Sequence, residues 1–68
     1  MEYANSLKGV AIFAMTHWKF YCAEFEKATN ECDAMLATGR AGAYAAIIRQ
    51  ITGRQPHDPI AQEIIDLM

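Results

Sequence analysis

The chain has 68 residues, 53% of them hydrophobic, and a formal net charge of -2 at pH 7. This composition is too apolar for a disordered segment, and the acidic balance argues against sequence-independent binding to nucleic acid, which requires a basic surface. A chain of this length forms one domain, here residues 1–68, and buries too little surface to hide so many apolar side chains alone. We therefore expect part of its apolar surface to pack against a second copy.

The first expected element is a long amphipathic helix over residues 6–37, with Asn5 or Ser6 as its N-cap. No proline occurs before Pro56, and apolar residues recur in alternating steps of four and three, as on one helical face. We expect this uncharged series to form the seam of a dimer. It consists of Leu7, Ala11, Ala14, Trp18, Tyr21, Phe25, Ala28, Cys32 and Met35.

The apolar stretch Val10–Phe25 within this helix has two other interpretations, a secretory signal and a membrane span. A signal peptide would be followed by small residues in an A-x-A cleavage pattern, which the stretch lacks. A membrane span needs about 20 apolar residues, whereas His17, Lys19 and Glu24 interrupt this stretch. The sequence therefore predicts a protein that has no membrane partner.

A turn at Gly39–Gly42 is expected to end the first helix, and a second helix is expected over residues 42–52. The apolar side chains of this second segment share one helical face; they are Tyr44, Ile47, Ile48 and Ile51. Gly53 directly after them is typical of a helix C-cap. Pro56 soon afterwards prevents the helix from continuing.

A third, short helix is expected over residues 59–67. Asp58 is a favourable N-cap, and Pro59 suits the first helical position, where no backbone N–H is needed. The predicted fold is thus all-α, with a long N-terminal helix followed by two shorter ones. The long helix would extend roughly 48 Å at ~1.5 Å per residue, so the shorter helices cannot cover its whole seam. We therefore predict a homodimeric helical bundle.

The residues that could carry chemistry do not have the spacing that catalysis or metal binding requires. His17 and Cys22 are five residues apart, whereas metal ligands on a helix stand three or four residues apart. The acidic residues between positions 24 and 33 lack the Glu-x-x-His pairs of a di-metal bundle. Neither glycine turn forms a phosphate-binding motif. We expect no catalytic residue, no metal, no cofactor and no enzyme activity.

The alternative function is DNA binding or transcription regulation by the last two helices, which follow one another as in a helix-turn-helix. The second helix of such a unit presents basic and amide side chains to the DNA groove. Here that helix offers Gln62 but also Glu63 and Asp66, whose carboxylates DNA phosphates repel. We therefore rank this alternative below protein binding and do not expect nucleic acid as a partner.

Aromatic and arginine side chains that one small core cannot hide form the candidate partner-binding surface: Phe13, Phe20, Tyr44, Arg40 and Arg49. Rings and guanidinium groups are typical anchors of protein interfaces. We expect a protein–protein interaction module that acts as an inhibitor, adaptor or co-chaperone, with an unidentified protein and a second copy as its partners. Two cysteines, Cys22 and Cys32, are expected as small buried thiols in a reducing cytoplasm, and the alternative is a disulfide between chains or a redox switch.

In size and helical layout the chain is similar to phage or mobile-element proteins that bind and disable a host protein. The segment ECDAMLATGRAGAY, read as a helix, a glycine turn and a second helix, is also similar to hairpin co-chaperones of bacterial secretion systems. Both resemblances imply a steric or conformational effect on a partner, without chemistry.

Overall fold

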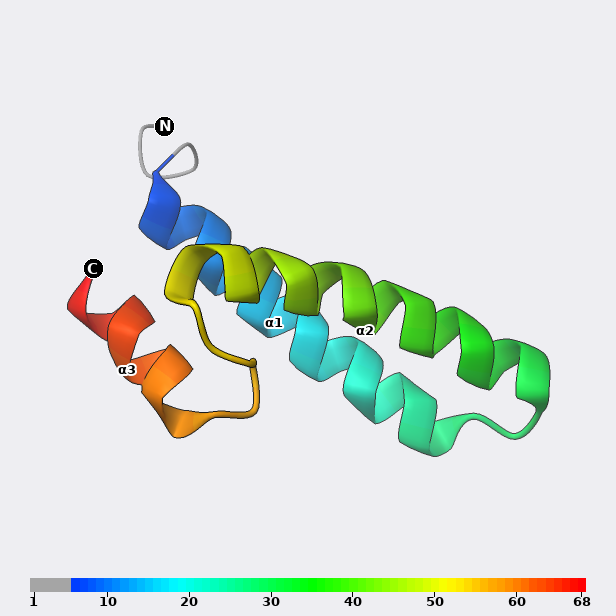
Figure 1. Cartoon of the computed structure of the whole chain (residues 1–68). Coiled ribbons are helices and arrows are strands. Elements are labelled where there is room, and N and C mark those ends of the chain that lie inside the picture. Colours follow the sequence, from blue (N-terminus) through cyan, green and yellow to red (C-terminus); the bar gives the residue numbers. More distant parts are fainter. Residues whose placement is uncertain (1–5) are drawn as a thin grey trace.

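The computed structural model describes residues 6–68 and contains, in that range, three helices and no strand (Figure 1). The helices are α1 (Leu7–Lys27), α2 (Glu31–Thr52) and α3 (Pro59–Leu67). The prediction of an all-α fold is confirmed. The predicted boundaries of the third helix, 59–67, agree with the structure.

Helices α1 and α2 lie side by side and antiparallel, and α3 packs at the end where α1 begins and α2 ends (Figure 1). The molecule measures 38 × 27 × 16 Å. Since a helix with its side chains is about 10–12 Å across, the shortest dimension leaves little depth for an interior. Most side chains of the hairpin therefore border either a neighbouring helix or solvent.

The predicted first helix over 6–37 is wrong beyond Lys27, where α1 ends. Ala28 adopts an extended backbone with φ -61° and ψ 133°. Asn30 is then the N-cap of α2, and its side-chain oxygen accepts a hydrogen bond from the backbone N–H of Asp33 at 2.8 Å. An Asn side chain in this position satisfies one of the free N–H groups of a helix start. The hairpin therefore turns at residues 28–30.

The predicted turn at Gly39–Gly42 is also wrong, and the second helix begins at Glu31 rather than at residue 42. Both glycines lie inside α2, where each costs about 1 kcal/mol relative to alanine. Packing of the inner face of α2 offsets this cost, because Ala37, Ala45 and Ile48 are buried. Tertiary contacts thus override the local tendency of the glycines to break the helix.

The remaining helix ends follow the local sequence signals. The Ser6 hydroxyl accepts a hydrogen bond from the Gly9 backbone N–H at 3.0 Å. Gly53 ends α2 in the left-handed conformation with φ 73°. Asp58 accepts a hydrogen bond from the Ile60 backbone N–H at 2.9 Å at the start of α3. The predictions of these three caps are confirmed.

The core is small and rich in alanine. All three helices contribute to its buried cluster, which consists of Ala11, Ala14, Met15, Ile48, Ala61 and Ile65. The predicted apolar face of the second helix is confirmed, because Ile48 is fully buried and Tyr44, Ile47 and Ile51 pack against the cluster. Small side chains at Ala11 and Ala14 let α1 approach its neighbours closely, so ring contacts between helices become possible.

We predict that Gly39→Ala stabilises the protein, raising the free energy of unfolding by about 0.5–1 kcal/mol, because alanine has less backbone freedom to lose in a helix. A methyl group there would meet no atom within 4 Å. Gly53→Ala is the matched control. Its positive φ should make alanine destabilising by about 1 kcal/mol. Urea denaturation at equal protein concentration measures both values, and a destabilised Gly39→Ala would contradict a continuous α2.

Asn30→Ala removes the N-cap of α2 and should lower the free energy of unfolding by about 1 kcal/mol. Asn30→Ser keeps an oxygen acceptor and should remain within a few tenths of a kcal/mol of the unaltered protein. The same urea titration tests the pair. Equal stability of the alanine and serine variants would show that the cap does not define the turn.

Candidate functional site

Five ring-bearing side chains form a continuous aromatic strip along the hairpin: Phe13, His17, Phe20, Tyr21 and Tyr44. Phe13, His17 and Tyr21 are spaced four residues apart on α1, so they lie in a row on one face of the helix. Phe20 flanks this row from α1, and Tyr44 joins it from α2. The strip therefore depends on the packing of the two helices.

Tyr44 is the centre of the aromatic strip, because its ring contacts three rings of α1. Its centroid lies 5.2 Å from that of His17, 6.0 Å from that of Phe13 and 5.9 Å from that of Tyr21. The Tyr21 and Tyr44 rings are stacked at 8°, whereas Phe20 meets Tyr21 edge-on at 5.0 Å and 83°. Such ring pairs contribute about 0.5–1.5 kcal/mol each beyond burial. The strip is thus held by contacts of its own.

His17 is fixed by a backbone contact as well as by its neighbours' rings. Its Nδ1 lies 2.9 Å from the Phe13 carbonyl oxygen, and since a carbonyl only accepts, Nδ1 donates this hydrogen bond. The Phe13 ring lies 4.0 Å from the imidazole, centroid to centroid. The hydrogen bond and the ring contact together orient the imidazole along the strip.

Arg40 of α2 stands at the end of the strip that faces the hairpin turn. Its guanidinium carbon lies 5.6 Å from the centre of the Tyr21 ring, a distance at which cation and ring attract each other. Among the residues that the structure describes, Arg40 takes part in no ion pair. Its positive charge therefore stays available next to the rings.

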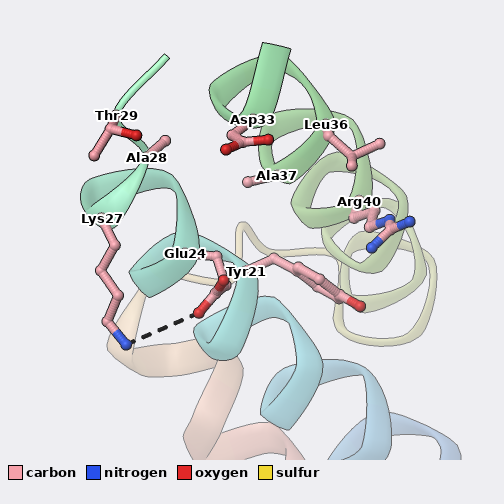
Figure 2. A pocket seen from close by; sticks show the side chains of 9 residues that line it. All are labelled: Tyr21, Glu24, Lys27, Ala28, Thr29, Asp33, Leu36, Ala37 and Arg40. Carbon is pink, nitrogen blue, oxygen red and sulfur yellow. Dashed lines mark ion pairs between the residues drawn. The ribbon is translucent and has the colours of Figure 1, made fainter. Parts of the chain in front are cut away.

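Beyond Tyr21 and Arg40, the space between α1 and α2 widens into a pocket of about 300 Å³ near the turn. Figure 2 shows Tyr21 reaching from α1 toward Arg40 on α2, with the Lys27–Glu24 ion pair of 3.9 Å on the α1 side. The pocket is lined by Tyr21, Glu24, Lys27, Ala28, Thr29, Asp33, Leu36, Ala37 and Arg40. Charges of both signs therefore border the turn end of the aromatic strip.

The aromatic strip is not buried despite its ring contacts. Phe13 is 53% exposed and Phe20 is 54% exposed, and Tyr21 and Tyr44 are half-buried. Aromatic side chains are enriched in protein interfaces, so this exposed strip is the candidate interaction surface.

Four of the five residues that we predicted for partner binding lie together in or beside this strip: Phe13, Phe20, Tyr44 and Arg40. Arg49 does not join them. It lies near the C-terminal end of α2 and donates from Nη1 to Gln55 Oε1 at 3.4 Å. His17 and Tyr21 also belong to the strip, although neither was among the residues predicted for partner binding. The signal that could have revealed them is the pair of four-residue steps from Phe13 to His17 and from His17 to Tyr21.

The predicted dimer seam is divided between two helices and a turn, so it is not one continuous face. Ala11 and Ala14 are buried inside the chain, and Trp18 and Tyr21 are half-buried. Ala28 lies in the turn, and Cys32 and Met35 are exposed on α2. Leu7 and Phe25 are exposed on α1. Within this chain, α2 and α3 already cover part of what we expected a second copy to cover.

A second apolar surface, the open groove, runs between α1 and α2. Its volume is about 530 Å³, and its lining is Trp18, Cys22, Phe25, Glu26, Thr38, Ala41, Gly42 and Ala45. Burial raises the pKa of the Cys22 thiol, and the negative charge of Glu26 raises it further. Cys22 and Cys32 are free thiols on α1 and α2. Cys22 is half-buried and Cys32 is exposed, so the prediction that both are buried is wrong.

Residues 6–68 hold no group of three or more His, Cys, Asp or Glu side chains placed to bind a metal ion. None of the described helices combines the length and the hydropathy that crossing a membrane requires. No family model, curated protein or solved structure matches the chain. The exposed rings and the open groove are therefore the candidate functional features of the described residues.

The raised pKa of Cys22 predicts slow alkylation, because only the thiolate reacts and less thiolate is present at a given pH. At pH 8, iodoacetamide should modify Cys22 in a Cys32→Ser variant more slowly than it modifies exposed Cys32 in a Cys22→Ser variant. Adding Glu26→Gln should accelerate Cys22 alkylation, because this removes a negative charge that disfavours the thiolate. Mass spectrometry over time measures the rates, and an unchanged rate with Glu26→Gln would contradict the charge effect.

Proposed function

We propose that this chain is a small, non-enzymatic protein–protein interaction module that binds another protein through the aromatic strip. The observation that supports this most directly is the stack around Tyr44, which holds Phe13 and Phe20 in place while more than half of each side chain stays exposed. Exposing large rings to water is unfavourable. A partner that covers them gains that free energy on binding.

The arrangement of the strip lowers the entropy cost of such binding. His17 is held by its hydrogen bond to the Phe13 carbonyl oxygen, and Tyr21 is held between Tyr44 and Arg40. Side chains that are ordered before binding lose little freedom on association, and aromatic anchors with a nearby arginine dominate many interfaces. A largely preformed surface on helices suits a module that binds by shape.

The chemistry of the strip also indicates what it would bind. Phe13, Phe20 and Tyr44 would accept aliphatic or aromatic side chains of the partner. Arg40, which has no ion pair among the described residues, would accept a carboxylate beside them. The partner segment is thus apolar with an acidic residue at one end. By covering that segment, the module would act sterically as an inhibitor, adaptor or co-chaperone, as phage or mobile-element proteins act on host proteins.

We also propose that the module works as a homodimeric helical bundle in the cytoplasm. Free Cys22 and Cys32 fit a reducing compartment. Support for a dimer is the set of large apolar side chains that one copy leaves exposed, since exposed apolar surface favours association. They are Leu7, Val10, Ile12, Phe13, Phe20, Phe25, Met35, Leu36, Ile60, Leu67 and Met68.

The binding surface is tested by Phe20→Ala, with Ile12→Ala as the matched control because Ile12 is an apolar residue of α1 that is 48% exposed and lies outside the strip. Tagged protein would be used to isolate partners from a lysate of the source cells, and the recovered partner would be titrated by calorimetry. Phe20→Ala should weaken binding at least about 10-fold, whereas Ile12→Ala should not.

Salt dependence separates this proposal from DNA binding. Affinity through the rings should change little between 50 and 200 mM salt, whereas binding through phosphate contacts falls steeply with salt, by about 10³–10⁵ for 6–10 contacts. Circular dichroism would verify that both variants remain helical. Equal weakening by the two substitutions, or binding to DNA that collapses with salt, would overturn the proposed surface.

A further inference from the structure

Helix α3 carries apolar side chains on two sides, and among the described residues only one side is fully buried. Ala61 and Ile65, four residues apart, are buried against the hairpin. Ile60, Ile64 and Leu67 follow one another at steps of four and three, which places them along a second stripe of the same helix. Ile60 is exposed and Leu67 is 87% exposed. Within residues 6–68, the two ends of this outer stripe, Ile60 and Leu67, therefore stay exposed.

The open groove adjoins the surface of α1 and α2 on which α3 packs. Met15, Trp18 and Cys22 share one face of α1, and Met15 packs with Ala61 and Ile65 in the core. On α2, Ala41, Ala45 and Ile48 share a face in the same way. The part of this hairpin surface near the start of α1 thus receives α3. The part nearer the turn, lined by Trp18 and Phe25, forms the open groove.

The outer stripe of α3 and the open groove agree in length and in chemistry. Ile60 and Leu67 are seven residues apart, as are Trp18 and Phe25, and seven residues of helix extend about 10 Å. Ala41, Gly42 and Ala45 form a side of the groove without bulky side chains, so another helix can approach closely. Glu26 is the single charged residue of its lining.

We propose that the open groove of each chain receives the outer stripe of α3 from a second copy, so that α3 lies between two hairpins. In a two-fold dimer the contact occurs twice, because each copy offers one groove and one α3. Two hairpins side by side with opposite directions would bring the α3 end of one copy to the turn end of the other. This inference rests on the self-association proposed above and specifies its surfaces.

The test uses full-length chains that are altered on either side of this contact. Leu67→Lys disrupts the outer stripe, and Phe25→Glu disrupts the groove at a residue that is 50% exposed. Met35→Lys is the control, since Met35 is 69% exposed and belongs to neither surface. Sedimentation across concentrations gives the molar mass, and circular dichroism verifies the helices.

The unaltered chain should have twice the 7.6 kDa of one copy. Leu67→Lys and Phe25→Glu should each raise the dimer dissociation constant at least about 100-fold, while Met35→Lys should not. Mixing the two disrupted variants should restore a dimer, because a heterodimer keeps one unaltered contact.

Other outcomes separate the two proposals. A dimer that neither variant weakens, or a mixture that stays monomeric, would overturn this contact and leave self-association intact. An unaltered chain that is monomeric at all concentrations would overturn self-association as well, and would leave the groove to a helix of a different protein. Partner binding through the aromatic strip is measured independently and is unaffected by either result.

Discussion

The close packing of α1 on α2 is the constraint on which the other features depend. Alanines at positions 11 and 14 leave room for Ile48 at the centre of the core. Because the helices approach closely, the ring of Tyr44 reaches three rings of α1 and a continuous aromatic strip forms. A bulkier contact would separate the helices and would also separate these rings. The same packing of α1 on α2 therefore forms both the core and the candidate binding surface.

The same packing explains why so much apolar surface remains outside. A hairpin with a single short helix across one end has few buried positions, and alanine fills many of them. Larger side chains such as Phe13, Phe20 and Phe25 cannot enter so thin a core, and they lie at its margins. Their exposure is unfavourable for an isolated chain. Association with other molecules would remove part of this apolar surface from water. The two proposed contacts cover different parts of it.

The two surfaces differ in ways that suit different partners. The aromatic strip combines rings, an arginine and a mixed-charge pocket, and in its proposed role it would discriminate among partner segments by charge as well as shape. The open groove is mostly apolar, with small residues on its α2 side and Glu26 as its one charged lining residue. It adjoins the hairpin surface on which α3 of the same chain packs. In the proposed dimer such a groove would recognise a helix by shape. A dimer formed through it would leave the strip of each copy free for another protein.

By itself the sequence determined the helical class, the caps at Ser6, Gly53 and Asp58, the span of the third helix and four residues of the candidate surface. Caps are predictable because a side chain or a glycine satisfies backbone groups only a few residues away. Tertiary structure decided where the hairpin turns. The Asn30 cap and the glycines at 39 and 42 are competing local signals, and burial of Ala37, Ala45 and Ile48 stabilises α2 across both glycines. Tertiary structure also decided that the Tyr44 ring contacts the rings of Phe13, His17 and Tyr21, because contacts between helices depend on the relative register of the helices.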